Sequence, residues 1–179
     1  FAEKSTMQSG FLSAEKPVTP ITPAELEALF TTTQAEAKRL RAILDPEETP
    51  YESRYEERSV LTSLSKQAAA NESASDSGSA EARRARTMRA LADGQLGRNF
   101  MDTEEPGSAQ AKLESAIEGL EGVAEEAVAY VEALNNLGVV WCNRGEAKTA
   151  LELLERARDA HAAAVKAANG GAAAAEGDD

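Results

Sequence analysis

Apolar residues recur three and four positions apart along much of the chain, which is the spacing of one face of an α-helix. The clearest stretch contains Leu134, Leu137 and Trp141, which form one apolar stripe. Residues 143–145 follow as a turn, and Gly145 suits the left-handed backbone that closes a helix. A second helix faces back through Ala150, Leu154 and Ala157. The pattern predicts a helical hairpin over residues 134–157.

This hairpin has the residue spacing of one tetratricopeptide repeat, in which Gly138 lets the second helix come close. A weaker copy precedes it, with Asp93 at the first apolar position. Gly97 and Gly138 lie 41 residues apart, against about 34 in the standard repeat. The copies predict hairpins stacked side by side. The matching positions of the weaker copy also include Ala109, Leu113 and Ala116, and the predicted repeat core is Leu96, Gly97, Phe100, Leu134, Leu137, Gly138, Trp141, Ala150, Leu154 and Ala157.

The rest of the chain divides by composition. Residues 1–21 show no sustained period and are interpreted as an extended arm. Thr22, Pro23 and Glu25 predict a capped helix start, and Asp45-Pro46 predicts its end. With a second helix over 51–70, residues 22–70 form an N-terminal hairpin. Residues 71–79 are a Ser-rich linker, 80–168 hold two tetratricopeptide-like hairpins, and 169–179 are a disordered tail after Gly170-Gly171. The fold class is therefore all-α, a helical-hairpin solenoid of about six helices.

Composition limits the partners. The chain has 179 residues and a net charge of −12, which disfavours nucleic acid and anionic membranes but permits a basic protein partner. The single cysteine, Cys142, forms no intrachain disulfide and suits a reducing compartment. The chain shows no signal peptide and no stretch of roughly 20 apolar residues, so we expect a soluble intracellular protein. The last helix presents Leu151, Leu153 and Val165, so we expect further repeats or a partner to stack on the C-terminal end.

We find no candidate catalytic constellation. His161 is the only histidine, and Cys142 lacks a neighbour that would activate its thiol. The cluster Asp102-Thr103-Glu104-Glu105 lacks the alternating ligands and glycine of a calcium loop. We therefore expect no enzymatic activity, no cofactor and no metal.

Repeat proteins bind partners along the surface lined by their first helices. The residues expected there are Arg98, Met101, Asp102, Asn135, Val139 and Asn143. Asparagine amides can pair with a bound main chain; the alternative is ordinary helix-surface polarity. A second cluster, Arg83, Arg84, Arg86 and Arg89, is either a solvated helix start that offsets neighbouring acids or a contact for an acidic peptide.

Three segments go beyond a generic repeat: residues 50–55 (PYESRY), residues 96–105 (LGRNFMDTEE) and residues 135–141 (NNLGVVW). Their content, order and spacing resemble the N-terminal part of the kinesin-binding protein family (KIF-binding protein), over roughly Thr22 to Ala160. The resemblance implies an all-helical, tetratricopeptide-like protein that binds the motor domains of certain kinesins and keeps them off microtubules. It also implies a location in the cytoplasm and on the cytoskeleton, the cilium included. The alternative is a structural scaffold component of a cytoskeletal or axonemal assembly.

Overall fold

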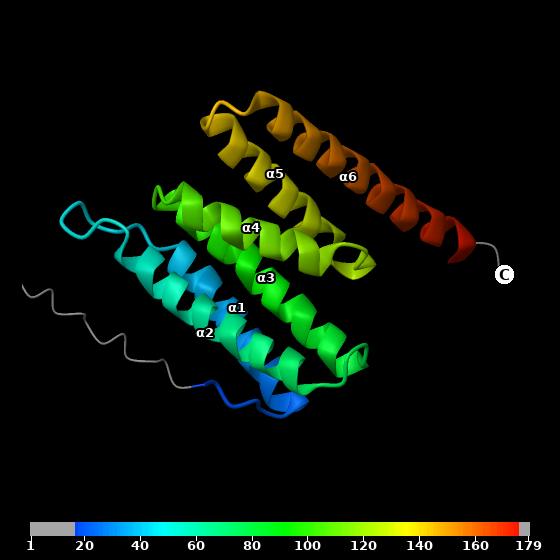
Figure 1. Cartoon of the computed structure of the whole chain (residues 1–179), viewed down its shortest axis with the longest axis horizontal. Coiled ribbons are helices and arrows are strands. Elements are labelled where there is room, and N and C mark those ends of the chain that lie inside the picture. Colours follow the sequence, from blue (N-terminus) through cyan, green and yellow to red (C-terminus); the bar gives the residue numbers. More distant parts are fainter. Residues whose placement is uncertain (1–16, 176–179) are drawn as a thin grey trace, which may run out of the picture.

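The computed structural model describes residues 17–175, with side chains described up to residue 169. That part of the chain contains helices and connecting turns and no strand, which confirms the all-α fold class (Figure 1). The predicted arm up to residue 16 and the last four residues lie outside the described part. The elements are α1 (Pro23–Arg41), α2 (Glu52–Ala74), α3 (Ala80–Asp102), α4 (Pro106–Leu120), the short 3-10 turn η1 (Ala124–Glu126), α5 (Ala127–Asn143) and α6 (Ala147–Ala175).

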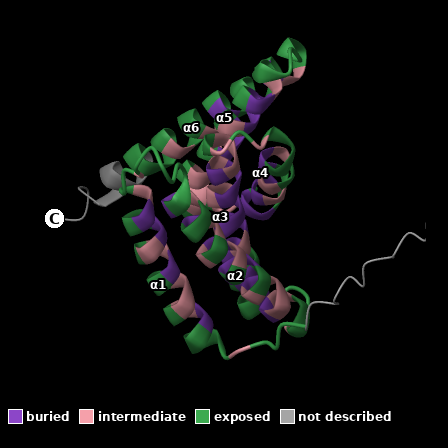
Figure 2. Cartoon of the chain, turned by 90° about the vertical axis from the view of Figure 1, so that its left-hand side faces the viewer, coloured by how far each residue is buried: buried purple, intermediate pink, exposed green. Residues whose placement is uncertain are grey.

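The six α-helices form three hairpins that stack in chain order. In Figure 1 the pair α1 and α2 lies at one end, α3 and α4 lie in the middle, and α5 and α6 lie at the other end. Each helix packs against the next one along the chain, and α3 also contacts α1 and α5. Buried residues line the helix sides that face one another (Figure 2). The stack is solenoid-like, as predicted.

The N-terminal hairpin begins where its local sequence predicts. The Thr22 hydroxyl accepts a bond from the Glu25 amide at 3.3 Å, and the Glu25 carboxylate accepts one from the Thr22 amide at 2.8 Å. This capping box satisfies two amides that a helix start otherwise leaves free. The helix ends at Arg41, before the Asp45-Pro46 stop. Asp45 instead accepts bonds from the amide and hydroxyl of Ser53, at 3.1 and 2.8 Å, and so holds the start of α2.

The predicted linker at residues 71–79 is wrong at its N-terminal side, because α2 continues to Ala74. Asn71 is buried, and its side-chain amide pairs with the backbone of Ile21 at 3.2 and 2.6 Å. Gln67 donates to the Thr19 carbonyl at 2.9 Å. These bonds hold residues 19–21, which precede α1 and are not helical, against α2. These tertiary hydrogen bonds satisfy the buried side-chain amide of Asn71 and so stabilise its position at the end of α2.

The predicted end of the last helix at residues 169–171 is also wrong, since α6 runs through both glycines to Ala175. A glycine inside a helix costs about 1 kcal/mol relative to alanine. Alanines on both sides, the strongest helix formers, outweigh that cost. Of the predicted tail, only residues 176–179 remain outside the described part of the chain.

The largest core cluster joins α4, α5 and α6. A Cβ on Gly97 would lie 2.5 Å from Leu113 Cγ, and one on Gly138 would lie 3.0 Å from Leu154 Cδ2. Both glycines therefore allow the close helix approach that the repeat pattern predicts. Leu154 is nevertheless 38% exposed, whereas Leu153 is 8% exposed. The buried members of the predicted core are Leu96, Gly97, Leu134, Leu137, Gly138, Ala150 and Ala157, and Phe100 and Trp141 are partly buried.

Leu154 stays partly exposed although it touches Gly138 of α5. Within residues 17–175, α5 is the helix with which α6 makes extensive contacts. Leu151 and Val165 of α6 are also exposed, at 57% and 44%. The α6 residues 160, 163, 164, 167 and 168 are alanines that border an apolar groove with Tyr130 and Val123. Stacking of further repeats or of a partner at this end stays a prediction.

Candidate partner-binding surface

The expected partner residues of α3 lie near its C-terminal end. Arg98 is partly buried and borders a groove between α3 and α5. Met101 is partly buried against the largest core cluster. Asp102 is exposed, and its carboxylate lies 3.7 Å from Arg54 Nε of α2. The three residues therefore share one helix end but have different surroundings.

The expected residues of α5 are all exposed, and Val139 is 43% exposed. Asn135, Val139 and Asn143 recur every fourth position, so they form a stripe along one side of the helix. The core faces the other side of α5, where Leu134, Leu137 and Val140 are buried. The stripe is a surface that a partner can reach.

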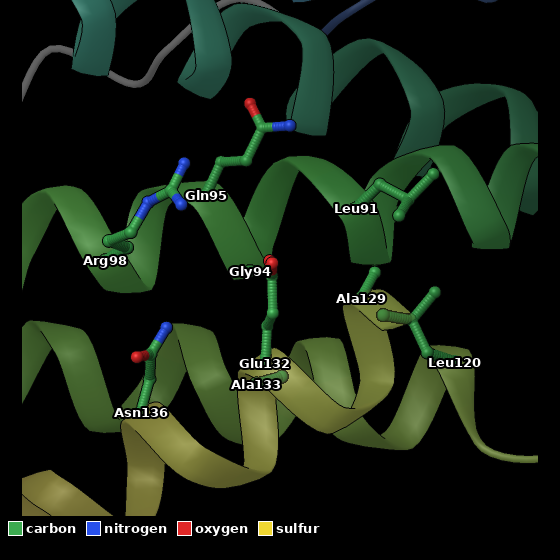
Figure 3. Close-up of a pocket in the computed structure, with 9 residues that line it drawn as sticks. All are labelled: Leu91, Gly94, Gln95, Arg98, Leu120, Ala129, Glu132, Ala133 and Asn136. Carbon is green, nitrogen blue, oxygen red and sulfur yellow. The ribbon is translucent and has the colours of Figure 1, made fainter. Parts of the chain in front are cut away.

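The α3–α5 groove is the first of two hollows beside this stripe. Figure 3 shows Leu91, Gln95 and Arg98 along α3, the helix opposite Ala129, Glu132 and Asn136 of α5, with the Gln95 side chain turned away from α5. The groove offers an acid from α5, Glu132, and a base from α3, Arg98. Sequence reasoning missed Gln95, Glu132 and Asn136, although their spacing of three and four from the chosen residues could have indicated them. Asn135 and Val139, which were expected to bind a partner, do not line this groove.

A second hollow brings together two expected residues from different hairpins. Met101 and Asn143 line it with Val140, with Glu104 and Glu105 of the turn before α4, and with Pro106 at the start of α4. Arg144, next in the chain, donates to the Pro106 carbonyl at 3.3 Å and stacks 5.2 Å from the centre of the Trp141 ring. The end of α5 is thus fixed against the start of α4.

The acidic turn after α3 is held from α2. Arg58 donates to the Thr103 hydroxyl at 2.5 Å, pairs with Glu105 at 2.8 Å and lies 4.1 Å above the centre of the Phe100 ring. Cation–π contact and a partly buried ion pair together favour one position of this turn. Glu104 has a left-handed backbone, with φ of 60°, and is exposed. The cluster therefore acts as a structural turn that also exposes negative charge.

The arginine cluster at the start of α3 is largely used within the molecule. Arg84 pairs with Glu27 of α1 at 2.7 Å, and Arg86 and Arg89 pair with Glu72 of α2 at 2.8 and 3.0 Å. The hydrogen bond from Arg84 lowers the pKa of Glu27 below its ordinary value of 4.5, and the same bond raises the pKa of Arg84. These pairs favour the first interpretation, in which the cluster offsets neighbouring acids.

The remaining candidate groups are isolated. Cys142 and His161 are both exposed. Within residues 17–175, no three His, Cys, Asp or Glu side chains are grouped so that they could hold a metal ion. Over the same residues, no helix combines the length and the apolar character that a bilayer crossing requires.

These features define the class of the molecule: a stack of helical hairpins with grooves between successive hairpins. Chicken (Gallus gallus) KIF-binding protein is 39% identical to this chain over 116 residues, which are 63% of this chain and 19% of the chicken protein. The matched region thus spans about a fifth of that relative's length. No family model matches the chain, and no solved structure matches it significantly.

Proposed function

We propose that the chain is a protein-interaction module that binds kinesin motor domains and regulates their attachment to microtubules. The observation that carries the proposal is the similarity to a KIF-binding protein, at 39% identity over 116 residues. The proposal assigns the chain a binding role without catalysis, in the cytoplasm and on the cytoskeleton. The tetratricopeptide-like character of its two C-terminal hairpins is part of the same proposal.

The charge of the chain supports this partner. The surface with which a kinesin meets acidic tubulin must be basic, and a chain of net charge −12 attracts a basic surface. Residues 102–126 contain eight acids and one base. Glu104 and Glu132 are exposed beside the grooves that Met101, Asn143 and Arg98 line. Acidic side chains therefore lie at the edges of the grooves in which we expect a partner to bind.

A binding assay against a panel of purified kinesin motor domains tests the proposal. We expect at least one motor to bind, and we expect added salt to weaken the complex because exposed charges are screened. The bound chain should also lower the microtubule-stimulated ATPase rate of that motor. Binding without any change in the rate would indicate a scaffold instead of a regulator. Absence of binding across the panel would refute the proposal.

The exposed amides of α5 provide a residue-level test. Changing Asn135 and Asn143 together to Ala should weaken motor binding, because interface amides lose their partners. The free energy of unfolding should change by less than about 1 kcal/mol, as at other exposed sites. Asn169→Ala removes an exposed amide from α6, away from both grooves, and is the matched control. A fold that weakens along with binding would show that the two α5 amides are structural.

A further inference from the structure

A small pocket between α1, α2 and α3 is rich in cationic and amide groups. Three of its lining residues carry positive charge and one carries negative charge. We call it the cation pocket, and its lining is Gln34, Ala37, Lys38, Arg41, Glu57, Gln95 and Arg98. The pocket therefore has a local excess of positive charge, although the chain as a whole has a net charge of −12.

Arg98 is the central residue of this pocket. It lines both the cation pocket and the α3–α5 groove, where Figure 3 shows it beside Gln95. Its Nε atom is buried and has no hydrogen-bond partner within residues 17–175. None of the ion pairs among those residues includes Arg98. Arg98 as a whole is partly buried, but its buried Nε–H is costly to leave without an acceptor, because that donor has lost water and gained no partner.

Two further donors in the same pocket lack acceptors. Arg41 pairs with Glu57 through a terminal nitrogen, but its buried Nε has no partner among the described residues. Gln34 accepts a bond from Gln95 through its oxygen, whereas its buried amide nitrogen has none. Arg98 and these two groups all require the same thing, an oxygen that accepts hydrogen bonds.

The carboxylate of Glu57, which also lines the pocket, is engaged with other partners. One of its carboxylate oxygens is used by Arg41, and the other accepts from Asn99 at 3.0 Å and lies 3.8 Å from Arg54. The carboxylate is fully buried at 0% exposure. No described residue that lines the pocket accepts a hydrogen bond from these three donors.

We propose that the cation pocket binds a carboxylate group of an acidic side chain on a protein partner. The two oxygens of a carboxylate match the planar donor array of an arginine, and Arg41 and Gln34 donate from the sides. Lys38, exposed at the rim, adds a second cation. A phosphate dianion suits the pocket less well, since Glu57 borders it and repels a double charge more strongly.

The identity of the partner rests on the proposed function, but the chemistry of the pocket does not. On a kinesin motor domain, the occupant would be an aspartate or glutamate within an otherwise basic surface. The acids near α5 would then attract the basic surface, and the cation pocket would fix the register of the complex. The acids near α5 would increase the association rate, and the one acidic side chain in the cation pocket would select partners that carry an acid at that position.

Nuclear magnetic resonance of the arginine Nε–H groups tests the pocket without any motor. The full chain, labelled with nitrogen-15, is titrated with acetyl-Gly-Glu-Gly-amide at constant ionic strength, and acetyl-Gly-Gln-Gly-amide is the neutral control. We expect saturable shifts at Arg98 and Arg41 with the glutamate peptide and none with the glutamine peptide. Equal responses to the two peptides, or no saturable response, would overturn the proposal. Tighter binding of inorganic phosphate than of the glutamate peptide would overturn the assignment to a carboxylate.

Two arginine variants separate the pocket from general charge effects. Arg98→Gln should weaken binding of the glutamate peptide about tenfold or more, the effect of losing one charge-assisted hydrogen bond. It should leave the melting temperature unchanged or raised, because Arg98 makes no ion pair that the change would break. Arg83→Gln, at an exposed arginine of the same helix, should leave peptide affinity unchanged. Equal weakening by the two changes would overturn the proposal.

A third variant covers the case in which Arg98→Gln does not fold. Lys38→Gln alters only an exposed side chain at the rim and should reduce the peptide affinity several-fold. Unchanged affinity in that variant, together with an unfolded Arg98→Gln protein, would refute the pocket. Peptide binding without binding to any motor would refute the proposed function and leave the pocket intact.

Discussion

The crossing of α3 and α4 allows one sharp test of how closely these helices pack. Gly119 of α4 is buried against Ala90 of α3. A Cβ added at Gly119 would lie 2.5 Å from the Ala90 Cβ, 3.7 Å from the Ala90 Cα and 3.6 Å from the Arg86 carbonyl oxygen. Neither methyl group can rotate away, so Gly119→Ala forces the two helix backbones apart.

The magnitude follows from two opposing terms. Carbon atoms prefer separations of about 3.5–4.0 Å, so the helices must part by about 1 Å. Overpacking of this kind costs about 1–3 kcal/mol, and a rigid pair of methyl groups favours the upper end. Alanine gains at most about 1 kcal/mol over glycine in a helix. The net loss is about 2 kcal/mol, which lowers the melting temperature of a chain this long by about 4–8 °C.

The same helix pair contains a matched control. A Cβ at Gly94 of α3 would lie 3.5 Å from the Ala116 Cβ of α4, which is an ordinary contact. Gly94→Ala should therefore leave stability unchanged or raise it by up to about 1 kcal/mol. Combining Gly119→Ala with Ala90→Gly returns a single methyl group to the contact. The double variant should be more stable than the sum of its two single changes by about 2 kcal/mol.

Urea unfolding followed by circular dichroism at 222 nm measures all four variants. Equal stability of the Gly119→Ala and Gly94→Ala proteins would refute the close crossing of α3 and α4. Strict additivity in the double variant would show that Gly119 and Ala90 do not touch.

Three further predictions follow from single contacts. Glu57→Leu should cost about 3 kcal/mol in urea unfolding, since it leaves Arg41 and Arg54 without their buried acid, and an unchanged midpoint would contradict the network. The pKa of Glu27 is lowered in the folded state, so its pair with Arg84 stabilises the fold fully at pH values above the ordinary carboxyl pKa of 4.5. We expect this part of the stability to be lost as the pH falls below 4.5 and through the lowered pKa of Glu27. Glu27→Gln should flatten this acid limb of the curve, and an unchanged limb would argue against the pair with Arg84. Trp141→Ala should cost about 2 kcal/mol in thermal unfolding, less than for a fully buried tryptophan because Trp141 is partly exposed, and a loss above 4 kcal/mol would contradict that position.

Much of the fold could be predicted because its signals are local. The capping box of Thr22 and Glu25, the turn at Gly145 with φ of 81° and the apolar stripe through Leu134 and Leu137 each depend on residues within a few positions. Periodicity therefore predicts six helices in three hairpins. It also predicts which face of α5 is turned toward the core.

The helix ends and the partner surface were harder to predict for a different reason. Asn71 appeared to begin a linker, but its bonds to Ile21, fifty residues away, keep it in α2. Leu153 and Leu154 are neighbouring residues of the same type, and the packing of α6 decides that Leu154 is the more exposed of the two. The periodicity of apolar residues along the sequence contains no information about contacts between residues that are far apart in the chain.

The candidate surface divides in the same way. Helical spacing alone indicates that Asn135, Val139 and Asn143 share one exposed stripe, because a side chain's direction on a helix depends on its position in sequence. The acceptorless donors of Arg98, Arg41 and Gln34 come from two helices and surround a glutamate from a third. Whether a buried cation has an acceptor depends on which side chains the packing brings within hydrogen-bond distance. The amino-acid sequence thus determined the helices and the spacing of residues along them, and the tertiary structure alone decided which buried donors lack an acceptor.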